Sequence, residues 1–411
     1  MTLFADLLAS VFERRDRAPA PAADDRPLPE LVADLVGAVG EVSGLALARQ
    51  ILERYRATSD AEKRAFFSHL AEGMAVDPAA VRAALEGLEA GQSRASYRAF
   101  LAAAEAPRQE LIRRLNQVPG ATGALVAMRA DLLRLIEGSA ALEALDLDFR
   151  HLFSSWFNRG FLVLRPISWE SPAHILEKII AYEAVHTIDS WSDLRRRLDP
   201  RDRRCFAFFH PAMPDEPLIF VEVALTDGVP GSVQALLAED RTPIAAEAAD
   251  TATFYSISNC QDGLAGISFG TSLIKQVVSD LALALPMLTT FVTLSPIPGL
   301  RAWSEDEGLS LDADVVRGVA ALYLLTARRG DGRPRDPVAR FHLGNGAEVY
   351  DLHAGADTST KGIAQSGGVM VNYLYDVSRL AENHERYATS VEIAASPGVR
   401  ALAAAAEPTP A

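Results

Sequence analysis

The sequence predicts an α+β fold, with an N-terminal all-α helical bundle domain over residues 1–147 and a mixed α/β domain over residues 148–400. Two observations support this prediction. From Leu28 to about Leu145 the chain is rich in Ala, Leu, Glu and Arg and has few β-branched runs, which is typical of helices. After Asp148, strand-like apolar runs alternate with helical patterns and with glycine- or proline-rich breaks, which indicates a sheet packed against helices.

Sequence signals for helix starts are clear in the first domain. Ser59 and Glu62 fit a capping box, in which two side chains satisfy free N–H groups of the first turn. Asp77 followed by Pro78 fits an N-cap with proline at the first helical position. We expect several antiparallel helices whose role is packing and self-association, because no residue pattern in this domain indicates catalysis.

The second domain contains the strands. Ser171 and Ser190 mark helix starts, and glycines and prolines separate the remaining segments. The expected strands cover residues 161–164, 205–210, 218–225, 253–258, 291–294 and 369–375, and the expected helices residues 172–184, 191–198, 233–239, 273–285 and 313–327.

Composition excludes several classes of protein. The 411-residue chain has a net charge of −14, which argues against a general nucleic-acid binder because phosphate neutralisation needs clustered Lys and Arg. No uncharged apolar run approaches the about 20 residues that span a bilayer, so no membrane association is expected. The N-terminus lacks a signal-peptide pattern, and the two cysteines, Cys205 and Cys260, form neither a disulfide framework nor a zinc pattern. A cytoplasmic location is therefore expected.

A glycine-rich turn is the first candidate binding element. Gly263, Gly266 and Gly270 lie between an expected strand and an expected helix. Glycines let the backbone approach a phosphate closely, and the free N–H groups of a helix N-terminus stabilise its charge. The turn is neither a Walker A loop nor the dinucleotide fingerprint, so a purely structural turn is the alternative.

Ser295 is the first candidate catalytic residue. It follows the apolar strand that begins at Phe291 and opens the run Ser-Pro-Ile-Pro-Gly that ends at Gly299. Proline cannot donate to a sheet ladder and restricts the residue before it, so Ser295 is expected at a stiff strand end. Without a Gly-x-Ser-x-Gly elbow the α/β-hydrolase fold is excluded, and a plain strand followed by a proline turn remains the alternative.

His342 is the second candidate catalytic residue, because imidazole titrates near neutrality and can donate or accept a proton. A structural histidine is the alternative, and His210, His353 and His384 are equally titratable by type. No two histidines have metal-ligand spacing. Tyr373 and Tyr375 lie two residues apart on an expected strand and should share a face, so either could line a pocket there. 

Several motifs in one order resemble the malonyl-CoA decarboxylase family, from about Asp148 to Arg379, with a helical domain ahead as in that family. The most distinctive is the run Ser-Pro-Ile-Pro-Gly that starts at Ser295. The motifs that carry the resemblance are Leu152-Phe-Ser-Ser-Trp-Phe157, Glu216-Pro-Leu, Val223-Ala-Leu-Thr226, Phe254-Tyr-Ser-Ile-Ser258, Leu273-Ile-Lys275, Leu294-Ser-Pro-Ile-Pro-Gly299, Pro337-Val-Ala-Arg-Phe-His-Leu343, Asn345-Gly-Ala347 and Asn372-Tyr-Leu-Tyr375.

The resemblance implies a catalytic domain related to GNAT-type acyl-CoA acetyltransferases, joined to a helical domain that forms a dimer or tetramer. It places the catalytic serine on Ser295, the catalytic histidine on His342 and a supporting tyrosine on Tyr375. The implied substrate-binding loop comprises Ala265, Gly266, Ile267, Ser268, Phe269, Gly270 and Thr271. Some relatives carry a glutamate where this chain has Ser268. If that carboxylate assists catalysis in them, this chain either lacks the function or supplies it with another group.

The implied reaction converts malonyl-CoA to acetyl-CoA and CO2 through an enolate. His342 would donate a proton to the α-carbon, and Ser295 would hydrogen-bond the carboxylate or the developing oxyanion and help to relay the proton. The thioester is itself the electron sink, so no cofactor or metal is expected. The alternatives are a GNAT-type acyl-CoA N-acyltransferase and a non-catalytic acyl-CoA sensor.

Overall fold

The computed structural model describes residues 25–267 and 273–407, and its contacts divide the chain into two compact units, Met1–Leu152 and Phe153–Ala411. The division falls within helix α9, a few residues after the expected boundary at residues 147/148. None of the helices in the described ranges has both the length and the apolar character that crossing a bilayer requires.

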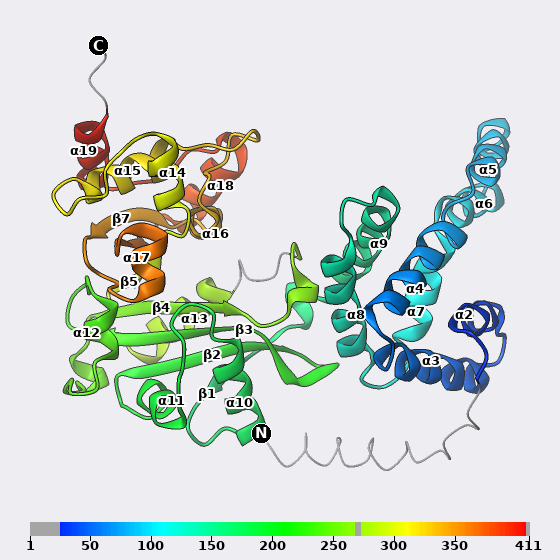
Figure 1. Cartoon of the computed structure of the whole chain (residues 1–411), viewed down its shortest axis with the longest axis horizontal. Helices are drawn as coiled ribbons and strands as arrows, with labels where there is room; N and C mark the ends of the chain where they lie inside the picture. Colours follow the sequence, from blue (N-terminus) through cyan, green and yellow to red (C-terminus); the bar gives the residue numbers. More distant parts are fainter. Residues whose placement is uncertain (1–24, 268–272, 408–411) are drawn as a thin grey trace. The chain divides into compact units, whose positions relative to one another are not determined.

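The first unit is helical (Figure 1). The capping box at Ser59 and the N-cap at Asp77 are both confirmed, because each side chain accepts a hydrogen bond from the first turn of its helix. Its helices are α2 (Leu28–Gly37), α3 (Glu41–Arg56), α4 (Asp60–Gly73), α5 (Pro78–Ala90), α6 (Arg94–Ala104), α7 (Pro107–Leu115), α8 (Ala121–Leu135) and α9 (Ala140–Trp156).

The second unit contains one eight-stranded sheet in the order β1-β2-β3-β4-β5-β8-β6, with β7 paired to the other side of β8. Neighbouring strands are antiparallel except β4 and β5, which are parallel. The strands are β1 (Val163–Ile167), β2 (Arg203–His210), β3 (Met213–Thr226), β4 (Thr251–Asn259), β5 (Thr290–Thr293), β6 (Ser295–Pro296), β7 (Glu348–His353) and β8 (Met370–Leu374).

Helices α10 and α11 cover the antiparallel part of the sheet. Ile179 of α10 and Leu194 of α11 pack with Ala207 and Phe220 of the strands in one fully buried cluster. The helices of this unit are α10 (Ala173–Tyr182), α11 (Trp191–Leu198), α12 (Val233–Leu237), α13 (Leu273–Ala284), α14 (Leu300–Asp306), α15 (Val316–Thr326), α16 (Pro337–Gly344), α17 (Thr360–Ser366), α18 (Leu380–Ser390) and α19 (Pro397–Ala406), with short 3-10 turns at Arg159–Phe161, Ala246–Ala248 and Asp262–Leu264.

The order of elements confirms the predicted fold class, a helical unit followed by a mixed α/β unit. Two local expectations were wrong. Residues 159–161 form a 3-10 turn, because the Asn158 side chain accepts a hydrogen bond from Gly160 N–H, and the strand begins at Val163. Sheet pairing also does not end before Ser295: β5 ends at Thr293, but Ser295 and Pro296 pair with β8 as the separate edge strand β6, where a proline is tolerated.

Candidate active site

The site lies where two parallel strands diverge. β4 and β5 pair only as far as Phe254 and Thr293, after which β4 continues to Asn259 and the chain beyond Thr293 turns to β8. The register of β3 against β4 shifts beside Tyr255, so β4 carries an irregularity at this point. A cavity of about 400 Å³ opens here, lined by Val185, Ile219, Phe254, Tyr255, Ile257, Asn259, Ser295, Pro296, Pro337, Val338, Phe341 and His342.

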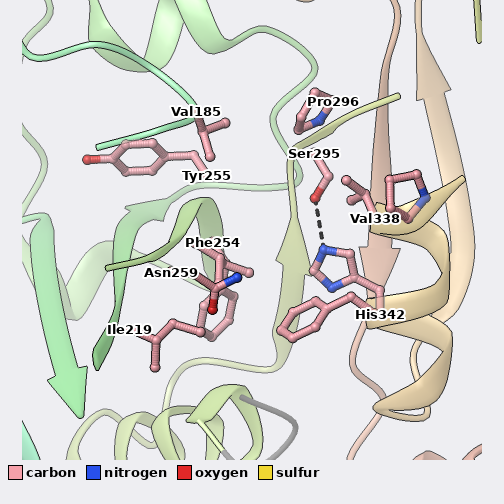
Figure 2. Close-up of a pocket in the computed structure, with 12 residues that line it drawn as sticks. Val185, Ile219, Phe254, Tyr255, Asn259, Ser295, Pro296, Val338 and His342 are labelled. Carbon is pink, nitrogen blue, oxygen red and sulfur yellow. Dashed lines mark hydrogen bonds between the residues drawn. The ribbon is translucent and has the colours of Figure 1, made fainter. Parts of the chain in front are cut away.

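Ser295 and His342 face each other in this cavity, as Figure 2 shows. Ser295 Oγ lies 3.2 Å from His342 Nε2 and donates a hydrogen bond to Thr293 Oγ1 at 2.8 Å. Only 5% of Ser295 is exposed. The strand pairing of Ser295 with Val371 fixes its backbone, so the hydroxyl is held beside the histidine.

His342 is placed by helix α16, which begins after the N-cap Asp336. The imidazole is 2% exposed and stacks on the Tyr373 ring, with centroids 4.5 Å apart and planes inclined by 23°. Its Nδ1 lies 2.8 Å from the Tyr375 hydroxyl. The predicted shared face of the two tyrosines is therefore confirmed, since both contact the same imidazole.

Burial sets the protonation states of His342 and Tyr375. Desolvation lowers the pKa of His342 to about 3, so the ring is neutral at physiological pH. Burial also raises the pKa of the Tyr375 hydroxyl well above its usual value, so this group keeps its proton. The Ser295 hydroxyl donates to Thr293, and each imidazole nitrogen of His342 faces a hydroxyl group, Nε2 that of Ser295 and Nδ1 that of Tyr375.

The predicted site residues fall into two groups. Ser295, His342 and Tyr375 are brought together although they are far apart in sequence. Ala265, Gly266 and Ile267 follow the 3-10 turn after β4 and are not among the residues that line the cavity. Gly266 has φ +75°, which favours glycine there. Ser268, Phe269, Gly270 and Thr271 lie outside the described residues.

Sequence reasoning missed several residues of the site. Thr293 could have been predicted from the sequence, because residues two positions apart on a strand lie on the same face and Thr293 precedes Ser295 by two positions. Asn259 at the end of β4 is a polar side chain that lines the cavity, and Asp336 caps the histidine helix. Within the described ranges, no cluster of His, Cys, Asp or Glu could hold a metal ion.

Known proteins and family models match both units of the chain. A family model of the malonyl-CoA decarboxylase N-terminal domain matches residues 74–157, and that of the malonyl-CoA decarboxylase C-terminal domain matches residues 160–314 and 307–410. The mitochondrial malonyl-CoA decarboxylase of Mus musculus is 32% identical over 462 residues, which cover 96% of this chain and 88% of the mouse protein.

Two solved structures are similar over nearly their whole length. The malonyl-CoA decarboxylase of Rhodopseudomonas palustris is 49% identical, with a TM-score of 0.86, and the match covers 91% of this chain and 98% of that one. The malonyl-CoA decarboxylase of Agrobacterium vitis is 48% identical, also with a TM-score of 0.86, and the match covers 92% and 99%. The chain therefore belongs to the malonyl-CoA decarboxylase family of carboxy-lyases.

Proposed function

We propose that this protein converts malonyl-CoA to acetyl-CoA and CO2, with Ser295 and His342 as its catalytic residues. The observation that supports the proposal best is the buried Ser295–His342 contact inside a mostly apolar cavity. Cleavage of the bond to the carboxylate leaves an enolate, whose charge is shared by the thioester oxygen and the α-carbon. Hydrogen-bond donors placed at that charge accelerate the reaction because they bind the transition state more strongly than the substrate.

In this mechanism His342 carries the proton that the reaction consumes. The imidazole is neutral in the free protein because burial disfavours its charged form. A malonyl carboxylate beside the ring raises its pKa, since an opposite charge favours the imidazolium, so one proton is taken up with the substrate. After CO2 leaves, Nε2 returns this proton to the α-carbon, and the Ser295 hydroxyl hydrogen-bonds the carboxylate or the oxyanion and helps the transfer.

The substrate is held, in this proposal, by the segment from Ala265 to Thr271 and by Tyr375. Lys275 follows that segment in the sequence, and its pKa is lowered by partial burial and then by the nearby charge of Arg159. Two neighbouring cations favour an anionic ligand such as the phosphates of coenzyme A. The thioester itself accepts the electron pair released on C–C cleavage, so the proposed reaction uses neither a metal nor an organic cofactor.

The test is an assay of the purified protein with malonyl-CoA as the sole substrate. We expect acetyl-CoA and CO2 in equal amounts without any added acceptor. Product formation only when an amine is supplied would instead identify an acyl-CoA N-acyltransferase. Tight binding of malonyl-CoA with no turnover would identify an acyl-CoA sensor, and either result would refute the proposed function.

We also propose that the helical unit joins copies of this chain into a dimer or tetramer. Helices α5 and α6 have no buried residues, and the apolar side chains Leu85, Tyr97 and Leu101 are exposed on them. Sedimentation equilibrium should give a multiple of the chain mass, and Leu101→Glu should shift the mass toward one chain. A single-chain mass for the wild type would contradict this proposal.

We place the protein in the cytoplasm as a further proposal, supported by two free, buried cysteines, Cys205 and Cys260, which fit a reducing compartment. Recovery of the protein in a membrane or secreted fraction of its own cells would contradict it.

A further inference from the structure

The Ser295 side chain has a second hydrogen-bond partner besides His342. Its Oγ donates to Thr293 Oγ1 at 2.8 Å and lies 3.2 Å from His342 Nε2. A serine side chain can adopt three staggered rotamers, so its hydrogen bonds help to decide which of them is occupied. The contact with Thr293 is the shorter of the two, and it therefore contributes to the place of the Ser295 oxygen in the cavity.

The Thr293 hydroxyl is itself held by strand β8. Its oxygen accepts a hydrogen bond of 3.2 Å from Tyr373 N–H, and the Asn372 side chain donates to the Thr293 carbonyl oxygen at 2.7 Å. β5 pairs with β8 at Val292 and Leu374, one residue away from these contacts. A backbone N–H group of a paired strand has a fixed position, and a β-branched side chain is restricted at χ1. The Thr293 oxygen is therefore a fixed acceptor for the Ser295 hydroxyl.

Thr293 is a polar residue in an apolar strand. It is 0% exposed, as are its neighbours Val292 and Leu294. Valine has nearly the same shape as threonine, and a buried hydroxyl disfavours folding unless it is hydrogen-bonded. Valine would therefore serve for packing alone, and the hydrogen bonds are what the hydroxyl adds. Thr293 is not among the residues that line the cavity, so it would act through Ser295 and not on the substrate.

We propose that Thr293 is a positioning residue, whose hydroxyl oxygen ties the Ser295 side chain to strand β8 and so holds the Ser295 oxygen beside His342. The Tyr373 ring stacks on His342 with centroids 4.5 Å apart, so the residue that fixes Thr293 also contacts the imidazole. One strand thereby sets the places of both catalytic side chains. The inference rests on the proposed function only for its kinetic readouts.

The test replaces Thr293 with valine, which keeps the branched shape and removes the hydroxyl. We expect kcat for malonyl-CoA to fall at least about tenfold with little change in KM, because small misplacements of catalytic groups cost large factors in rate. Thr253→Val is the matched control. Thr253 is a 0% exposed threonine of β4 that pairs with Val292 and lies outside the residues that line the cavity. Its replacement should leave kcat within about twofold of the wild type.

Two further variants separate positioning from general damage. Thr293→Ser keeps the hydroxyl without the methyl group, and its kcat should stay within about threefold of the wild type. In a Ser295→Ala protein, Thr293→Val should lower the rate by less than about twofold, because the side chain that it positions is already gone. A wild-type kcat for Thr293→Val, an equal loss for valine and serine, or an equal loss in both Ser295 backgrounds would overturn the inference.

A crystal structure of Thr293→Val tests the inference without an assay. The Ser295 oxygen should have moved out of hydrogen-bond reach of His342 Nε2, and an unchanged distance of 3.2 Å would contradict the proposed role. An inactive wild type would refute the proposed function, whereas this distance would still test the inference.

If Thr293→Val does not fold, Thr293→Cys replaces it in each comparison, because a thiol is a weaker hydrogen-bond partner than a hydroxyl. We expect at least about a threefold loss of kcat in the wild-type background and none in the Ser295→Ala background. The same loss in both, or none in either, overturns the inference.

Discussion

A protein with asparagine in place of His342 should decarboxylate malonyl-CoA about 10²–10⁴-fold more slowly than the wild type, the usual contribution of a positioned general acid. The effect should lie in kcat, because asparagine fills most of the same space but has no nitrogen that can carry a proton to the α-carbon. The measurement is the release of acetyl-CoA and CO2 at saturating malonyl-CoA, together with the affinity for coenzyme A.

The matched control for this variant is His210→Asn. His210 is a half-buried histidine of β2 that packs on Phe157 and lies outside the residues that line the cavity. It should keep kcat within about twofold of the wild type, as expected for a site distant from the chemistry. A folded His342→Asn protein that binds coenzyme A and turns over at the wild-type rate would remove His342 from the mechanism.

Local features of the sequence predicted a large part of this fold. The helix starts at Ser59 and Asp77 could be read because a capping side chain acts within three residues of its own position. The shared face of Tyr373 and Tyr375 followed from the two-residue period of a strand. These signals are short-range, so they do not depend on how distant segments pack.

The distances within the site could not be predicted in this way. His342 reaches Ser295 because β8 pairs with β6 and helix α16 packs beside β8. No local sequence pattern predicts either contact. Burial depends equally on the whole fold, and it is burial that makes the imidazole neutral. The pattern Asp-Pro predicted a helix start at Asp77, yet the same pattern at Asp336 caps the helix that carries His342 and is 1% exposed.

Gly299, the last residue of the Ser-Pro-Ile-Pro-Gly run, should tolerate no side chain. Gly299→Ala should therefore both destabilise the protein and slow its decarboxylation of malonyl-CoA. The φ of Gly299 is −97°, a value that alanine adopts easily, so the backbone is not the obstacle. The obstacle is the Tyr323 hydroxyl, which would lie 2.3 Å from the new Cβ atom. Overpacking of this kind costs about 1–3 kcal/mol, and we expect kcat to fall about tenfold as Ser295 moves from His342.

Tyr323→Phe should reverse most of that loss, because it removes the clashing oxygen and leaves the ring carbon Cζ 3.4 Å from the added methyl group. Alone, Tyr323→Phe should preserve activity, since the Tyr323 hydroxyl has no hydrogen-bond partner among the described residues. The four proteins of this cycle are compared by thermal unfolding and by kcat for malonyl-CoA. If Gly299→Ala costs as much with phenylalanine at position 323 as with tyrosine, the contact with Tyr323 does not explain why this position is glycine.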